Sequence, residues 1–81
     1  MYYVYLLHDD LDHLYVGYTA NLRNRLQSHI AKKTYTTSRF VNLKLIYYEA
    51  YLSEKEARKR EIKLKQYGSS YTGLLKRLGV K

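Results

Sequence analysis

The alternation of hydrophobic and polar positions along the chain predicts three short strands. Residues 2–7 combine tyrosine, valine and leucine, and residues 13–18 return to this composition after a polar, aspartate-rich turn over residues 8–12. Aromatic and β-branched runs on both sides of a turn are typical of a β-hairpin. Residues 43–51 form a third run of the same character. We therefore expect a hairpin and, later in the chain, one more strand.

A period of four predicts a helix between the hairpin and the third strand. Leu22, Leu26 and Ile30 recur every fourth residue, which is the spacing of an apolar stripe along one side of a helix. Asn21 has a side chain that commonly caps a helix N-terminus. We expect a helix over about residues 22–31 whose stripe packs on the sheet.

Two more helices are expected in the second half of the chain. The serine and glutamate that begin and end residues 53–56 have the spacing of a capping box. This favours a helix over about residues 54–67, with Gly68 as its C-terminal stop. Three leucines predict a last helix over about residues 70–78, which ends at Gly79.

The order of these elements, ββα-β-αα, indicates an α+β fold with a small three-stranded antiparallel sheet flanked by helices. Residues 1–81 are expected to form one domain, because 81 residues lie near the lower limit for a chain with its own core. The lack of cysteine excludes disulfides and thiolate metal sites. There is no signal pattern and no hydrophobic run of membrane-spanning length, so we expect a cytoplasmic protein with no membrane partner.

The charge of the chain is strongly basic and uneven. The net charge is +8, and residues 41–81 hold ten Lys and Arg against four Glu, whereas residues 1–40 hold five against three Asp. This distribution favours a polyanionic partner, with nucleic acid first, and a location at the nucleoid. Solubility alone is the other interpretation of a basic composition. The eleven tyrosines can stack on bases, but they are also good strand formers.

The hairpin brings two tyrosines together if its turn is centred on Asp10. In that register Tyr5 lies opposite Tyr15, and Tyr3 lies opposite Gly17. Residues directly opposed in an antiparallel pair share a face of the sheet. We therefore expect the phenols of Tyr5 and Tyr15 to be neighbours.

Polar residues stand at positions where the helical pattern favours apolar ones. Arg25 and His29 are four residues apart, so they lie one turn from each other along the edge of the apolar stripe, and neither faces fully outward. Ala57, Glu61 and Leu64 are spaced four and three, which places a carboxylate on an inward face. A buried carboxylate without a partner is costly, so Glu61 needs a cation or strong hydrogen bonds.

Two kinds of cation could satisfy Glu61. One is a basic side chain, namely Arg58, Lys65 or, across the core, Arg25. The other is a metal ion held by one carboxylate, water and a substrate phosphate, which is the usual environment of Mg²⁺.

These features together resemble the GIY-YIG nuclease superfamily, and in particular its small stand-alone bacterial members, whose domain is similar to that of excision-repair and intron-homing endonucleases. The segments that carry the resemblance are Tyr3-Val4-Tyr5, Tyr15-Val16-Gly17, Asn21-Leu22, Arg25-Leu26, His29 and Arg60-Glu61. The sequence departs from the family pattern in that Tyr3 stands where the first glycine would be and valine twice replaces isoleucine. It also has no evident counterpart of an asparagine that some relatives carry near the C-terminus.

The resemblance implies a catalytic site and a cofactor. Tyr5 and Tyr15 match the paired catalytic tyrosines, Arg25 matches the catalytic arginine, and His29 matches the histidine one turn later. Glu61 matches the metal-binding glutamate, with Mg²⁺ or Mn²⁺ as the single divalent ion. Gly17 and Asn21 match positions to which we assign structural roles.

The implied activity is hydrolysis of DNA phosphodiester bonds, selective for structure rather than sequence, in repair or recombination. Branched, flapped or single-stranded DNA is the expected substrate, with a separate targeting protein left open. A catalytically weak or idle nucleic-acid-binding module of the same fold is the main alternative, and a basic helix that docks on an acidic protein or membrane surface ranks last. The basic residues expected to contact phosphates are Lys32, Lys33, Arg39, Lys55, Arg58, Lys59, Arg60, Lys63 and Lys65.

Overall fold

The computed structural model describes residues 1–31 and 37–80. The elements, in chain order, are β1 (Tyr2–His8), β2 (Leu14–Thr19), α1 (Leu22–Ile30), β3 (Lys44–Tyr51), α2 (Glu54–Lys65) and α3 (Ser69–Leu78). The predicted α+β fold and its ββα-β-αα order are confirmed, and the ends of the elements differ from the predicted ones by one or two residues.

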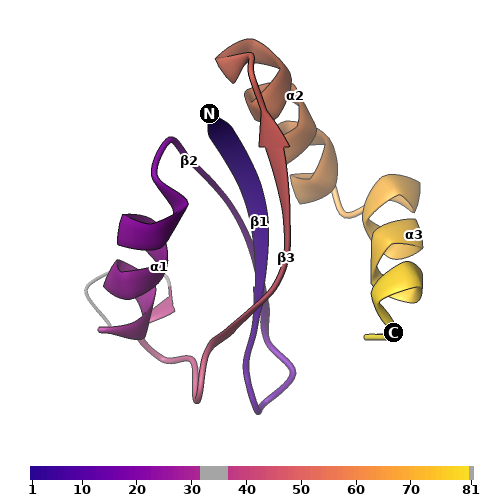
Figure 1. Ribbon diagram of the computed structural model, residues 1–81. Coiled ribbons are helices and arrows are strands. Elements are labelled where there is room, and N and C mark those ends of the chain that lie inside the picture. The colour runs from indigo at the N-terminus through magenta and orange to yellow at the C-terminus, as the bar shows by residue number, and fades with distance from the viewer. Residues whose placement is uncertain (32–36, 81) are drawn as a thin grey trace.

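The three strands form one antiparallel sheet in the order β2-β1-β3, so the first strand of the chain is the central one. Figure 1 shows α1 on one side of this sheet and α2 and α3 on the other. None of the helices in the described part of the chain is long and apolar enough to cross a membrane.

The hydrophobic core lies between the sheet and the pair α2 and α3. Val4 and Leu6 of β1 and Val16 of β2 point to this side and pack with Leu64 and Leu74. Because successive strand residues face opposite sides, the intervening residues of β1 point toward α1 instead. The core face also carries partly buried tyrosines, namely Tyr2, Tyr18, Tyr47 and Tyr51. The opposite face carries Tyr3, Tyr5, Tyr15 and Tyr48.

The hairpin register differs from the predicted one by two residues. Tyr5 pairs with Gly17, and Tyr15 pairs with Leu7, so the expected pairing of Tyr5 with Tyr15 was wrong. A shift of two residues keeps every side chain on its original face, whereas a shift of one would reverse it. Tyr5 and Tyr15 thus remain neighbours on one face, as diagonal rather than opposed residues.

The reason for the shift is the loop between β1 and β2, which is centred on Leu11 rather than on Asp10. The carboxylate of Asp9 is buried and accepts hydrogen bonds from the backbone N–H groups of Leu11, His13 and Val41 at 2.7–3.1 Å. These bonds fix a loop over residues 9–13. They also attach it to the segment that precedes β3.

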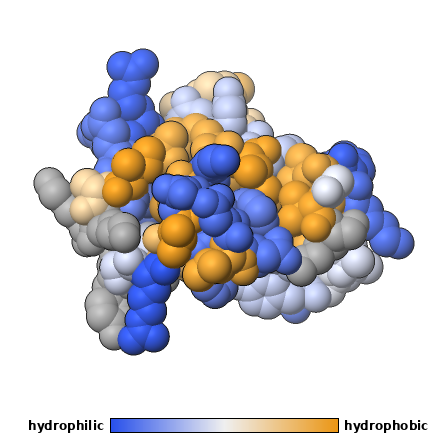
Figure 2. Space-filling view, turned by 90° about the horizontal axis from the view of Figure 1, so that it is seen from below, coloured by the Kyte–Doolittle hydropathy of each residue, from blue (hydrophilic) through white to orange (hydrophobic). Residues whose placement is uncertain are grey.

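The same contacts set the protonation of Asp9. Burial alone would raise the pKa of this carboxyl, but the hydrogen bonds from the backbone of Val41 and His13 outweigh burial and lower its pKa to about 2. Figure 2 views the end of the molecule where this loop lies and shows hydrophobic side chains around a hydrophilic group.

The predicted helix caps are confirmed at the N-termini and need one correction at a C-terminus. Asn21 and Ser53 accept hydrogen bonds from the backbone three residues later, as expected of N-caps. However, α2 ends before Gly68, because Tyr67 already has left-handed backbone with a φ of 55°. Gly68 instead caps the N-terminus of α3, and Gly79 ends that helix with a φ of 74°.

Candidate active site

Tyr5 lies at the centre of the sheet face that is turned toward α1. Its side chain is 1% exposed, and its hydroxyl forms a hydrogen bond of 2.8 Å with Nε2 of His29. The other ring nitrogen, Nδ1, forms a bond of 2.6 Å with Oγ1 of Thr37. Both partners of His29 are hydroxyl groups that can donate or accept, so a neutral imidazole is satisfied at both nitrogens. The result is a buried chain of three side chains from β1, α1 and the segment before β3.

The position of His29 differs from the one expected on α1. The predicted apolar stripe ended at Ile30, but Ile30 is 59% exposed and His29 is 1% exposed. The imidazole takes the inward position because two hydrogen bonds compensate its burial there. Burial, followed by the charge of Arg25, lowers the pKa of His29, so the ring is held in its neutral form.

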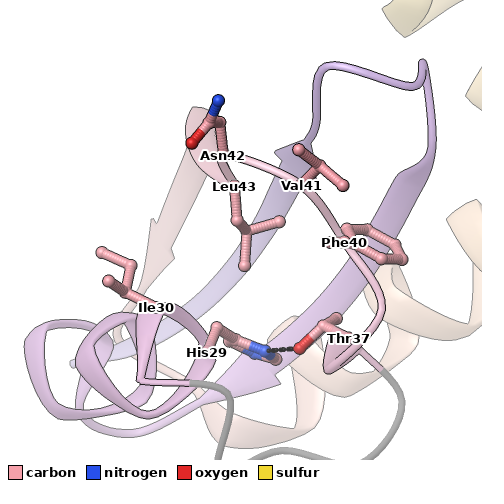
Figure 3. Close-up of a pocket in the computed structure, with 7 residues that line it drawn as sticks. All are labelled: His29, Ile30, Thr37, Phe40, Val41, Asn42 and Leu43. Carbon is pink, nitrogen blue, oxygen red and sulfur yellow. Dashed lines mark hydrogen bonds between the residues drawn. The ribbon is translucent and has the colours of Figure 1, made fainter.

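Thr37 is a residue of this site that the sequence pattern did not identify. It stands in a hydroxyl-rich stretch where each serine and threonine is an equal candidate. Figure 3 shows Thr37 and His29 facing each other in a pocket that is also lined by residues 40–43. The pocket therefore lies on the Nδ1 side of His29, away from the tyrosines.

Tyr15 lies beside this chain and is more accessible. Its ring centroid is 6.2 Å from that of Tyr5 and 5.1 Å from that of His29. Tyr15 is half-buried, and the Nζ atom of Lys65 lies 5.8 Å from its ring centroid. The predicted proximity of the two tyrosines is therefore found, with α2 contributing a cation next to the second one.

Gly17 leaves the space that the Tyr5 ring occupies. A Cβ atom at position 17 would overlap the Cζ and hydroxyl atoms of Tyr5. Gly17 has no positive φ that would itself require glycine. Its role in the structure is to let the phenol lie flat across β2.

Two charged groups from different helices act on the Tyr5 hydroxyl. Burial, followed by the nearby Tyr15, raises the pKa of Tyr5 well above its ordinary value. The charge of Glu61 on α2 adds to this increase, and the guanidinium of Arg25 on α1 opposes it. Tyr15 and His29 are therefore direct neighbours of Tyr5, and the charges of Arg25 and Glu61 lie near enough to act on its hydroxyl. Arg25 is exposed, and its guanidinium still acts on the Tyr5 hydroxyl, which agrees with the expectation that it does not face fully outward.

The sequence that forms this site matches a known protein family. The sequence pattern of the GIY-YIG catalytic domain matches residues 1–74. The chain belongs to the GIY-YIG family. This is a family of nucleases that act on DNA, so the match indicates a nuclease-type function.

Similar GIY-YIG chains occur in several bacteria. A UPF0213 protein of Streptococcus agalactiae is 39% identical over 66 residues, covering 79% of this chain and 74% of the relative. A UPF0213 protein of Staphylococcus haemolyticus is 37% identical over 68 residues, covering 82% of each. The solution NMR structure of the UPF0213 protein BH0048 from Bacillus halodurans has a TM-score of 0.59 at 30% identity, covering 96% of this chain and 85% of that one. These matches confirm the predicted family and fold.

GIY-YIG nucleases generally use a divalent metal, and Glu61 has the chemistry to hold one. Its side chain is 17% exposed, and its Oε2 atom lies 3.0 Å from Nζ of Lys65. The interpretation of Glu61 as the partner of a basic side chain is thus confirmed for Lys65. The ammonium also shows that a cation can reach this enclosed carboxylate.

The donor set around Glu61 is small. Within residues 1–31 and 37–80, no three His, Cys, Asp or Glu side chains gather into a metal-binding group. A single carboxylate oxygen suits Mg²⁺, which keeps several water ligands and completes its shell with substrate phosphates.

The basic residues predicted to contact DNA fall into three groups. Lys32 and Lys33 lie outside the described residues. Arg60 is partly buried and its guanidinium is bound to Glu49 by contacts of 3.0–3.1 Å, so its contact with DNA stays a prediction. The third group is exposed and consists of Arg39, Lys55, Arg58, Lys59, Lys63 and Lys65. Arg58 also covers the ring of Tyr18, and Arg58, Lys59 and Lys65 form ion pairs with glutamates.

Proposed function

We propose that this GIY-YIG protein is an endonuclease that hydrolyses DNA phosphodiester bonds with one divalent metal ion. The observation that carries the proposal is that three side chains from two helices act on the Tyr5 hydroxyl, one by a hydrogen bond and two by their charge. β1 supplies the phenol, α1 supplies His29 and Arg25, and α2 supplies Glu61. A guanidinium, a carboxylate and two phenols at one surface are the groups that phosphodiester hydrolysis needs.

Glu61 would hold Mg²⁺ or Mn²⁺, and the ion would supply Lewis-acid polarisation of a phosphoryl oxygen and stabilisation of the leaving group. Lys65, whose side chain is long and partly exposed, would have to leave the carboxylate for Glu61 to hold an ion. In its displaced position the ammonium remains available to a DNA phosphate.

Arg25 binds the scissile phosphate. Its exposed guanidinium can donate two parallel hydrogen bonds to non-bridging oxygens, and these bonds strengthen as negative charge accumulates in the transition state.

The two tyrosines have different roles because their surroundings differ. Tyr5 is buried with a raised pKa, so it keeps its proton and serves as a fixed hydrogen-bonding group. Tyr15 is half-buried on the same face, and we assign to it the orientation of the attacking water. His29 fixes the Tyr5 hydroxyl. Because its imidazole is buried and bonded to this hydroxyl, we assign His29 to the positioning of Tyr5 rather than to a contact with phosphate.

DNA is bound mainly through its backbone. The exposed cations of α2 and Arg39 give sequence-independent affinity. We therefore propose a preference for branched, flapped or single-stranded DNA, with a role in repair or recombination.

A DNA-binding module without catalysis is the second candidate function. It is favoured by the 3.0 Å contact between Glu61 and Lys65, which already neutralises the carboxylate. In this alternative the ion pair persists on DNA and no metal is taken up.

Cleavage of labelled single-stranded, duplex and flapped DNA, with Mg²⁺, with Mn²⁺ and with EDTA, separates the two candidates. We expect metal-dependent cutting that falls by at least about 10²-fold in Glu61→Gln, Arg25→Ala and Tyr15→Phe. Glu56→Gln is the matched control, because it neutralises an exposed glutamate on the same helix that pairs with Lys59.

The outcomes are distinct. Cutting that survives Glu61→Gln contradicts the proposed mechanism. Tight binding by the wild-type protein and by Glu61→Gln, with no cutting under any metal condition, supports the binding module instead.

A further inference from the structure

A groove beside the candidate active site has no role in the mechanism above. It lies on the side of the sheet that α1 covers (Figure 1) and is lined by Tyr3, Ala20, Asn21, Leu22, Arg23 and Tyr48. Two tyrosines from β1 and β3 thus face the start of α1, where Arg23 supplies an exposed cation. We propose that this groove binds one unpaired nucleobase of a polynucleotide, next to the phosphate that the active site would cut.

The groove is continuous with the candidate active site. Tyr48 is the direct cross-strand partner of Tyr5, and Tyr3 is two residues from Tyr5 along β1, so the three share a face of the sheet. Two strand residues span about 7 Å, so the groove lies within one or two nucleotides of the active site along a bound strand. A strand whose phosphate reaches Arg25 and Tyr15 would therefore place a neighbouring nucleotide at the groove.

The two tyrosine rings are arranged to receive a flat ligand. Their centroids are 6.1 Å apart with an angle of 65° between the planes, so Tyr3 supports Tyr48 edge to face. Tyr48 is 53% exposed although it lies in the middle of a strand. A tyrosine that is held in place while its surface stays in water offers a stacking platform of the kind that single-stranded nucleic acids use.

The charge near the groove selects the occupant. The net charge of the chain is +8, and Arg23 has a planar guanidinium that can stack on a base or pair with its phosphate. A polyanion with exposed aromatic rings matches both the tyrosines and the cation. In a paired duplex the base faces are hidden by stacking, so only an unpaired base can enter.

This inference rests on the proposed action on DNA and explains the proposed preference for flapped or single-stranded substrates. A base that must be unpaired to enter the groove would make flapped or single-stranded DNA a better ligand than duplex.

Binding in EDTA, measured by fluorescence anisotropy, tests the groove without cleavage. The probes are a flapped DNA and a fully paired duplex of equal length. We expect Tyr48→Ala to weaken binding of the flap by about 5- to 150-fold and to leave duplex binding unchanged, as for the loss of one stacked base. Tyr48→Phe keeps the ring and should bind like the wild type. Tyr67→Ala is the matched control, since Tyr67 is 59% exposed in an edge-to-face pair outside the groove.

A change in the ligand completes the test. An abasic site in place of the unpaired base should weaken binding to the wild type and leave binding to Tyr48→Ala unaltered. Equal losses on flap and duplex, or abasic DNA bound as tightly as intact DNA, would overturn the proposal. Tyr48→Phe keeps the ring and the fold of the groove. If it binds the flap as tightly as the wild type, and Tyr48→Ala still binds duplex normally, the loss in Tyr48→Ala is due to the missing ring and not to misfolding.

The two proposals can fail separately. If Tyr48→Ala binds less flap but no DNA is cut with any metal, the groove is supported and the nuclease proposal fails. If the wild type cuts and Tyr48→Ala binds flap and duplex as the wild type does, the groove is refuted and the nuclease proposal stands.

Discussion

At the scale of single residues, the arrangement of the site depends on the space and the hydrogen-bond partner that the buried Tyr5 side chain requires. The phenol requires an empty position on β2, which Gly17 supplies, and a fixed acceptor or donor, which His29 supplies. Thr37 in turn satisfies the second nitrogen of His29. Gly17 is small because the Tyr5 ring fills the adjacent space, and His29 and Thr37 are polar because each satisfies a buried hydrogen-bonding group.

Gly17→Ala tests this dependence. The added methyl group overlaps the Tyr5 ring, so the ring or the strand must move, at a cost of about 1–3 kcal/mol in the free energy of unfolding. Denaturant unfolding measures this loss, and cleavage assays should show reduced activity because the hydroxyl leaves His29. Gly73→Ala is the control, since a methyl group there meets nothing within 4 Å. Equal stability of Gly17→Ala and the wild type would contradict the expectation.

At the scale of elements, one polar cluster attaches α2 to the sheet. Glu49 of β3 accepts hydrogen bonds from both Nε and Nη2 of Arg60 and from the hydroxyls of Tyr47 and Tyr51. Burial, and then the bond to Glu49, raises the pKa of Tyr51 to about 12, so this phenol remains a donor. Because Arg60 precedes Glu61 on α2, the cluster also sets the position of the proposed metal ligand.

Arg60→Ala should therefore affect both stability and activity. It leaves the enclosed Glu49 carboxylate without its cation, and we expect a loss of about 1–3 kcal/mol in the free energy of unfolding. Arg58→Ala removes an exposed ion pair with Glu54 and the contact of the guanidinium with the Tyr18 ring, and should cost about 1 kcal/mol. Thermal or denaturant unfolding compares the two variants. A smaller loss for Arg60→Ala than for Arg58→Ala would exclude the cluster as an anchor.

Periodicity predicted the elements because each strand and helix has a clear pattern and clear caps. It also placed Glu61 and Leu64 on the inner side of α2, where both are at least partly enclosed. It failed where a side chain forms a contact far away in sequence. Asp9 shifted the hairpin by bonding to Val41, and His29 displaced Ile30 by bonding to Tyr5. No local pattern contains these partners, which is also why Thr37 was missed.

At the scale of the whole molecule, the Asp9 carboxylate holds together two segments that are far apart in the sequence. It connects the β1–β2 loop to Val41, while Asp10 is bonded to Asn42 beside it. The segment that leads from Thr37 to β3 is therefore fixed at one end by His29 and at the other by this carboxylate.

Acid should weaken this connection. The pKa of Asp9 falls from 3.8 to about 2 on folding, so its contribution to stability is present above pH 3.8 and is lost as the pH falls toward 2. We expect the difference in free energy of unfolding between the wild type and Asp9→Asn to shrink over this interval. Urea denaturation at a series of pH values measures it. If the difference in free energy of unfolding stays constant down to pH 2, ionisation of Asp9 does not stabilise the fold.

The contact between Tyr5 and Gly17 makes two separate parts of the family motif a single steric unit. The tyrosine of the first tripeptide occupies the volume that the glycine of the second leaves empty. A relative that loses this tyrosine no longer has a steric reason to keep the glycine. Comparing the two positions across relatives therefore distinguishes chains that retain the site from chains that retain only the fold, before any of them is assayed.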